Sequence, residues 1–140
     1  MGEGYLLDTG FIVALVDARD RDHARCTEVW KSVRGKLVSV EGVLAEAAHL
    51  LRRNPGGVRH AVELAIAAGT IFVPSSSKRF RRALDLIDKY RDLPMDWVDA
   101  LLVASAEETG INQVLTLDER GFLSYRIHGR RPFQLLPVPE

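Results

Sequence analysis

The chain has 140 residues, of which 46% are hydrophobic and 27% charged, a balance that excludes a disordered or collagen-like protein. Its 19 basic and 19 acidic residues cancel, so no global positive field attracts nucleic acid and only local charge can do so. The length suits one domain spanning residues 1–140.

Cysteine usage and the first residues bear on the cellular compartment. The single cysteine, Cys26, can form neither an internal disulfide nor a paired-cysteine zinc site. The chain begins without the basic segment of a signal peptide, and its first apolar run, residues 5–7, ends at Asp8, too early to span a membrane. We therefore expect a cytoplasmic protein without membrane attachment.

Taken in chain order, the hydrophobic pattern alternates between short strands and longer helices. The first half predicts a strand at 5–7, a helix at 11–16, a helix at 23–33 capped by Asp22, a strand at 36–40, and helices at 42–53 and 58–68. The second half predicts a strand at 70–73, a helix capped by serines 75–77 and reaching 90, a buried helix at 96–109 closed by Gly110, a strand at 113–117 and an edge strand at 133–136. Strands separated by such helices pair in parallel, so we expect an α/β fold with a mainly parallel sheet sandwiched between helices.

Two aspartates directly follow predicted strands. Asp8 comes after the strand at 5–7, and Asp118 after the strand at 113–117. Either one alone is more simply explained as a turn or helix-cap residue. Because ligands of open parallel sheets bind at the carboxyl edge of the strands, the pair favours a functional site there.

Two further acids interrupt apolar helix faces. Glu46 shares its face with Val43 and Leu50, and Asp99 is followed one turn later by Leu102 and Val103. A carboxylate removed from water without a partner costs several kcal/mol. A buried arginine is the simpler compensation for one acid, whereas a divalent cation compensates several at once. Oxygen ligands without paired Cys or His favour magnesium or manganese.

Asp96 stands three residues before Asp99, near the start of its predicted helix. Capping of the free backbone N–H groups is the simplest role for Asp96. Because residues three apart lie on nearly one helix face, Asp96 could also serve as an outer metal ligand through water. Crowding of these acids without metal should raise at least one folded-state pKa.

Basic residues gather at 78–82, at 126–131 and at a pair of arginines before the turn at 54–57. A solvated helix face is the simpler explanation of each group. If the ligand is a nucleic acid, the arginines nearest Asp118 in the chain could hold its backbone, with the earlier pair as a second strip. These candidates are Arg120, Arg126, Arg130, Arg131, Arg52 and Arg53.

Several short motifs extend over nearly the whole chain: Asp8-Thr9 after the first strand, Glu46 in a mid-chain helix, Asp99-Ala100 in an apolar helix, and the segment 116–126 after a late strand. Their order and spacing resemble PIN-domain nucleases, and the toxin-like VapC branch fits best. The resemblance implies a three-layer α/β/α sandwich whose acids hold one or two Mg²⁺ or Mn²⁺ ions and hydrolyse RNA.

The resemblance also assigns roles residue by residue. The implied metal ligands and catalytic residues are Asp8, Glu46, Asp99 and Asp118. Thr9 and Thr116 would orient the carboxylates through their hydroxyls, whereas Asp96 falls outside the most regular part of the pattern. As partners, the resemblance implies a second copy of the chain in a homodimer and a small antitoxin protein that plugs the acidic pocket.

Other functions stay open. A structure-specific DNA nuclease is the nearest alternative. A non-catalytic PIN-derived binding protein would use the same pocket without turnover, although retention of all four acids argues against it. In an aspartyl-phosphate phosphatase Asp8 would be the nucleophile, but such enzymes have a second acid two residues later, where this chain has Gly10.

Overall fold

A central parallel sheet organises the protein, whose computed structural model describes residues 3–140. The strands are β1 (Tyr5–Leu7), β2 (Leu37–Ser39), β3 (Ile71–Phe72), β4 (Gln113–Leu115) and β7 (Gln134–Leu136), in the order β3-β2-β1-β4-β7. Each of the four pairings between neighbours is parallel, and β7 forms one edge, as the sequence predicted.

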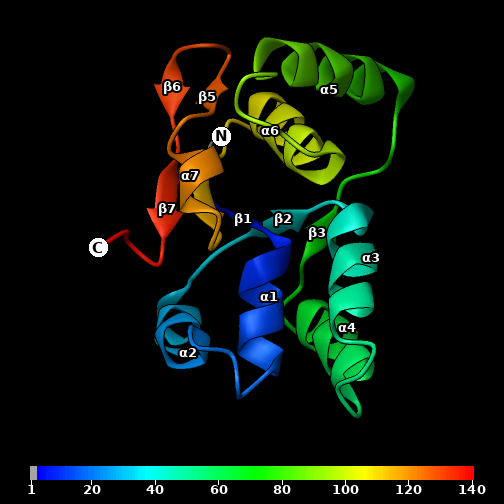
Figure 1. Cartoon of the computed structure of the whole chain (residues 1–140), viewed down its shortest axis with the longest axis vertical. Coiled ribbons are helices and arrows are strands. Elements are labelled where there is room, and N and C mark those ends of the chain that lie inside the picture. Colours follow the sequence, from blue (N-terminus) through cyan, green and yellow to red (C-terminus); the bar gives the residue numbers. More distant parts are fainter. Residues whose placement is uncertain (1–2) are drawn as a thin grey trace.

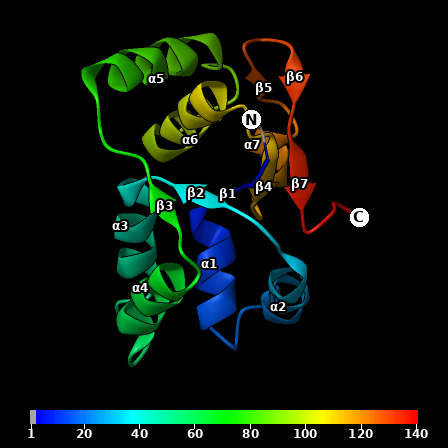
Figure 2. The same ribbon diagram turned by 180° about the vertical axis from the view of Figure 1, so that it is seen from behind.

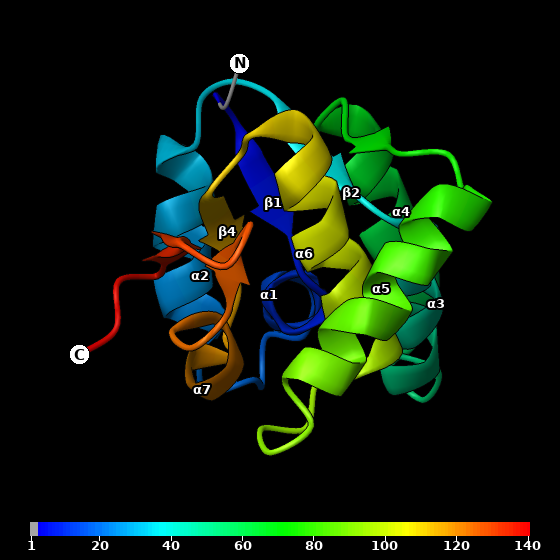
Figure 3. The same cartoon turned by 90° about the horizontal axis from the view of Figure 1, so that it is seen from above.

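Helices cover both faces of this sheet and make three layers (Figure 1 and Figure 2). One layer contains α1 (Thr9–Val16), α2 (His23–Ser32), α3 (Glu41–Leu50) and α4 (Gly57–Ala67). The opposite layer contains α5 (Ser77–Lys89) and α6 (Trp97–Thr109). Seen from above, α6 lies over the sheet with α5 beside it (Figure 3). The predicted α/β/α sandwich with a parallel sheet is confirmed.

The core lies between these layers. Leu6 and Leu7 of β1 and Val114 and Leu115 of β4 are fully buried, because a parallel sheet covered on both faces has no solvent side. Helix α6 is buried from Ala100 to Ala106 without interruption, as its almost uniformly apolar sequence predicts. Asp99 therefore belongs to an element that the rest of the fold holds firmly in place.

Two ion pairs join α5 to α6 and engage the basic run at 78–82. Arg79 is only 7% exposed and donates to both carboxylate oxygens of Glu108, each at 2.8 Å. Arg82 binds Glu107 in the same two-point manner, at 2.7 and 3.0 Å. Paired arginines of this kind fasten helices together and are not available for a phosphate.

The structure differs from the sequence prediction in a few local features. Asp22 makes no capping hydrogen bond at the start of α2; it forms an ion pair with Arg25 at 3.4 Å instead. The third helix ends at Leu50 rather than at Arg53, and turns follow. Three short elements were not predicted: α7 (Glu119–Phe122) and the antiparallel hairpin of β5 (Arg126–Ile127) and β6 (Arg131–Pro132).

None of the helices formed by residues 3–140 has the length and apolarity that a membrane crossing requires.

Truncation of a buried leucine in α6 tests this account of the core. Leu101 is 7% exposed, so Leu101→Ala should lower the free energy of unfolding by about 2 to 5 kcal/mol through lost burial and a cavity. Urea denaturation followed by circular dichroism measures the change. Leu84→Ala on α5 is the control, because Leu84 is 55% exposed and its loss should cost no more than about 0.5 kcal/mol. Equal costs for the two variants would contradict the packing described for α6.

Candidate functional site

The carboxyl edge of the sheet brings Asp8 next to the end of β4. Leu7 pairs with Leu115 in the register of β1 and β4, and the backbone N–H of Asp8 donates to the Leu115 carbonyl at 3.0 Å. Asp8 then caps α1: its Oδ1 accepts from the Thr9 N–H at 2.8 Å. Its Oδ2 accepts from the Thr116 hydroxyl at 2.6 Å. Both oxygens of this buried carboxylate are thus fixed in orientation.

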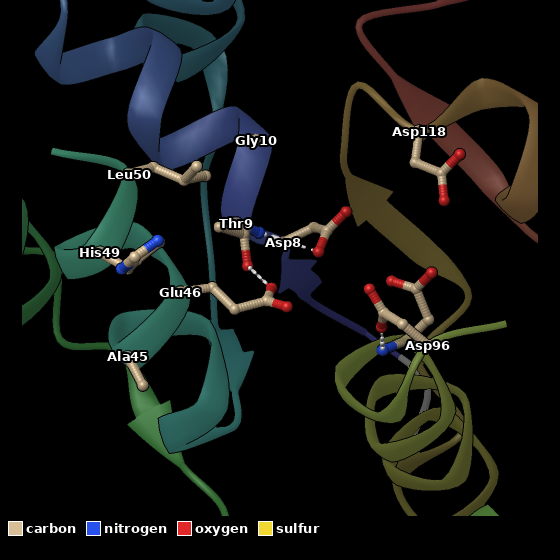
Figure 4. Close-up of a pocket in the computed structure, with 10 residues that line it drawn as sticks. Asp8, Thr9, Gly10, Ala45, Glu46, His49, Leu50, Asp96 and Asp118 are labelled. Carbon is tan, nitrogen blue, oxygen red and sulfur yellow. Dashed lines mark hydrogen bonds between the residues drawn. The ribbon is translucent and has the colours of Figure 1, made fainter.

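A cavity of about 560 Å³ opens at this edge, between α1, α3 and the start of α6 (Figure 4). All five acids that the sequence singled out line it, although they are widely separated along the chain. The lining residues are Asp8, Thr9, Gly10, Ala45, Glu46, His49, Leu50, Asp96, Asp99 and Asp118. The predicted convergence of the acids on one pocket is therefore observed.

The α3 and α6 walls each contribute acids. Glu46 projects from α3, and its Oε1 accepts a hydrogen bond from the Thr9 hydroxyl at 2.7 Å. Asp96 caps α6 by accepting from the Asp99 N–H at 2.8 Å, which is the capping role that its position predicted. Asp96 nevertheless also lines the pocket beside Asp99.

Asp118 closes the pocket on the side of β4. Its Oδ1 accepts from the backbone N–H of Gly121 at 3.1 Å and so caps α7. Its own N–H donates to the Thr116 hydroxyl oxygen at 3.0 Å. Gly121 leaves room for this arrangement, because a Cβ there would lie 2.5 Å from Asp118 Oδ2 and 2.9 Å from the Tyr125 hydroxyl. Thr116 therefore contacts both strand-end aspartates.

The electrostatics of the pocket favour protonated carboxyls. Burial, followed by the negative charges of Asp8, Asp96, Asp118 and Glu46, raises the pKa of Asp99 to about 8. Burial likewise raises the pKa of Asp8 to about 6, although its hydrogen bonds from Thr116 and Thr9 oppose the shift. The crowding expected from the sequence is present, but loss of water contact is the larger cause of both shifts.

Within residues 3–140, none of the five pocket acids forms an ion pair with a lysine, arginine or histidine. The alternative of a buried arginine as counter-ion is therefore not realised. Carboxylate oxygens without a positive partner are the ligands that Mg²⁺ and Mn²⁺ prefer. In the same residues, no three Asp, Glu, His or Cys side chains already stand at metal-binding distances. The donor set thus fits a hard divalent ion chemically, and side-chain rotations would be needed to close around it.

The six candidate arginines lie at different distances from these acids. Arg120 lines a smaller cavity of about 160 Å³ that shares Asp118 with the main pocket. Arg52 and Arg53 are exposed just after α3, and Arg52 donates to the His49 carbonyl at 2.7 Å. Arg126 donates to the carbonyls of nearby residues in the chain, and Arg130 is exposed in the β5–β6 hairpin. Arg131 donates to the Gly110 carbonyl at the opposite end of α6 from Asp99, so it lies on the far side from the pocket.

The sequence placed Leu50 on the face of Glu46 but did not assign it, His49 or Tyr125 to this region. The buried Tyr125 places its hydroxyl 3.4 Å from Asp99 Oδ2. His49 and Leu50 line the pocket beside Glu46. The helix-face argument that placed Leu50 beside Glu46 extends to His49 at i+3, whereas no local signal relates Tyr125 to Asp99.

Comparisons with known proteins give a consistent result. The family model described as PIN domain matches residues 5–127. The chain is similar to ribonuclease VapC26 of Mycobacterium tuberculosis (strain ATCC 25618 / H37Rv), with 28% identity over 134 residues, or 94% of this chain and 99% of the relative.

Two solved structures have a similar fold. Mycobacterium tuberculosis VapC20, a Sarcin-Ricin loop cleaving toxin, superposes with a TM-score of 0.76 at 21% identity over 82% of this chain and 90% of its own. A toxin-antitoxin complex from Klebsiella pneumoniae gives a TM-score of 0.67 at 15% identity over 86% of this chain and 91% of its own. At such identities these likenesses establish the shared fold.

The raised pKa values predict how stability of the metal-free protein depends on pH. In the folded state Asp8 and Asp99 hold their protons up to pKa values of about 6 and 8, against an ordinary value of 3.8. Their contribution is fully present below pH 3.8 and is lost as the pH rises to about 8. The melting temperature in EDTA should therefore fall between pH 6 and 8, and Asp99→Asn should flatten that fall because Asn carries no charge. Asp88→Asn, an exposed change on α5, should follow the wild-type curve. A wild-type slope retained in Asp99→Asn would show that Asp99 does not hold the proton.

Proposed function

This chain belongs to the PIN domain family, and on that premise we propose that it is a metal-dependent endoribonuclease and the toxin of a toxin–antitoxin pair. The observation that carries the proposal is the pocket of five carboxylates with no ion-paired cation among residues 3–140. Similarity to ribonuclease VapC26 supports RNA as the substrate. We further propose that the 140 residues form a single nuclease domain.

The proposed ligands of a Mg²⁺ or Mn²⁺ ion are Asp8, Glu46, Asp99 and Asp118, with Asp96 as an outer ligand through water. When bound, such an ion supplies Lewis acidity, which acidifies a water molecule and stabilises negative charge on the phosphate. The same four carboxylates are therefore the proposed catalytic residues. Their oxygens leave the choice between magnesium and manganese open.

The protein's own groups prepare this site. The hydroxyls of Thr116 and Thr9 donate to Asp8 and Glu46, so each carboxylate keeps one oxygen turned toward its threonine. With its pKa near 8, Asp99 holds a proton at neutral pH in the metal-free protein and must release it when a cation binds. Metal affinity should accordingly increase with pH up to about that value.

The proposed substrate is single-stranded or looped RNA, because a regular duplex restricts access for in-line attack at one phosphate. Arg120 is the best-placed candidate for a phosphate contact, since it shares a cavity wall with Asp118. Arg52 and Arg53 follow α3 at the other side, and Arg126, Arg130 and Arg131 would serve only an RNA that extends along the β5–β6 hairpin.

We also propose two protein partners. A small antitoxin that inserts an arginine among the carboxylates would supply the positive charge that the described residues do not provide. Similarity to the Klebsiella pneumoniae toxin-antitoxin complex supports such a partner. A second copy of this chain, forming a homodimer, is the other proposed partner.

Cleavage of labelled nucleic acid tests the activity. Purified protein with Mn²⁺ should cut single-stranded RNA, EDTA should abolish the cleavage, and Asp99→Asn should reduce kcat/KM at least about a hundredfold because a ligand carboxylate is lost. The experiment includes single-stranded and branched DNA of matched sequence. Cleavage of DNA alone would establish the alternative DNA nuclease, and cleavage of neither would favour a binding protein.

Orientation of Asp8 by Thr116 has its own test. Thr116→Val keeps the shape of the side chain but removes the hydroxyl that donates to Asp8, so Mn²⁺ affinity should fall roughly tenfold to a hundredfold. Titration calorimetry measures the dissociation constant. Thr109→Val is the matched control, since its hydroxyl bonds only within the far end of α6 and toward Ile111. Equal Mn²⁺ affinities for the two variants would exclude an orienting role for Thr116.

A further inference from the structure

The pocket has two chemically different walls. Asp96, Asp99 and Asp118 form the wall at the start of α6 and after β4. Across from Asp96 and Asp118, His49 and Leu50 project from α3 on the other side of the cavity (Figure 4). Beyond Glu46, this wall offers an isobutyl group, which binds neither a divalent ion nor a phosphate, and one imidazole, a softer ligand than the carboxylate oxygens that Mg²⁺ and Mn²⁺ prefer.

Within the described residues, neither the His49 ring nor the Leu50 side chain packs in the core or makes a hydrogen bond. Leu50 is 58% exposed, whereas its neighbour Leu51 is 1% exposed and packs in the core. His49 is exposed, and its ring makes no hydrogen bond or ion pair with any other residue in the described range 3–140. Ala45, one turn earlier on the same face, is small and leaves the approach to His49 open.

The size of the cavity exceeds what metal binding requires. Its volume of about 560 Å³ is many times that of a water-sized ligand, about 30 Å³, and falls within the range of small-molecule sites. Along α3, one helical turn separates Glu46 from His49 and Leu50, roughly 5 Å. That step is comparable to the separation of phosphate and base within one nucleotide, so both parts can be held side by side.

Charge decides which part of the substrate meets this wall. The ionised carboxylates of the pocket repel a phosphate except where a cation is held among them. A nucleobase is neutral, its faces stack on planar or apolar side chains, and its edge can exchange hydrogen bonds with a ring nitrogen.

We propose that Ala45, His49 and Leu50 form a nucleobase subsite, which holds the base of a nucleotide next to the scissile phosphate and gives the enzyme its nucleotide preference at that position. The inference rests on the proposed ribonuclease function and extends it to the selection of the cleavage site. The base packs against the imidazole of His49 and the side chain of Leu50, while its phosphate faces the carboxylates across the cavity.

Kinetics on a randomised single-stranded RNA with Mn²⁺ test the subsite. The double variant His49→Ala/Leu50→Ala should raise KM by roughly tenfold with little change in kcat, because base stacking contributes to binding in the ground state and transition state alike. Sequencing of the product ends should show that the nucleotide preference beside the cut is flattened. The melting temperature should stay at the wild-type value because both side chains are exposed. The Mn²⁺ dissociation constant should also stay unchanged, because neither residue is a proposed metal ligand.

Two further variants distinguish stacking of a base on His49 from a general effect of the mutations and from a role of the ring nitrogens. His60→Ala/Ile66→Ala on α4 is the matched control, because both residues are exposed and lie outside the pocket, with Ile66 64% exposed. It should retain the wild-type KM and nucleotide preference. His49→Phe keeps a stacking surface without a titrating nitrogen and should retain most of the affinity for RNA.

Several results would overturn the subsite. An unchanged KM and preference in the double variant, with wild-type cleavage intact, would refute the base subsite alone and leave the ribonuclease proposal standing. A weakened Mn²⁺ affinity would make His49 a metal ligand, and a fall in kcat in both His49→Ala and His49→Phe would make it an acid–base group. No cleavage of RNA by the wild-type protein would end both proposals.

Discussion

Uncompensated negative charge at the carboxyl edge of the sheet is the constraint on which the rest of this structure depends. Five acids line one cavity, and among residues 3–140 no basic side chain pairs with them. The protein limits the cost in two ways. Protonation neutralises part of the charge, as the raised pKa of Asp99 indicates, and backbone N–H groups stabilise several of the carboxylates.

Helix starts supply those N–H groups. Asp8, Asp96 and Asp118 cap α1, α6 and α7, and in each case one carboxylate oxygen accepts the capping bond. From the sequence, capping and ligand binding looked like competing explanations of the same aspartates. The structure makes them compatible, because each cap fixes a carboxylate at a helix start that itself faces the pocket. Capping thereby orients the side chains that the proposed function uses.

Ion pairs hold two arginines of α5 away from this edge. Arg79 and Arg82 are bound by Glu108 and Glu107 near the end of α6, about eight or nine residues beyond Asp99, a distance of roughly 12 to 14 Å along the helix. The backbone N–H of His128 donates to the same Glu107 and joins the β5–β6 hairpin to α6. Basic groups therefore stabilise one end of α6 while the other end remains available for the acidic pocket.

The sequence alone determined the alternation of strands and helices, the burial of α6 and the acids worth considering, because hydrophobic periodicity and helix-face position are local properties. Only the tertiary structure decided that Asp8 and Asp118 share Thr116, that Tyr125 meets Asp99, and that His49 faces the carboxylates. It also assigned Asp22 to an ion pair and formed α7 and the hairpin. Contacts such as Thr116 with Asp8 join residues 108 positions apart, and no pattern within a single segment encodes how two distant segments meet.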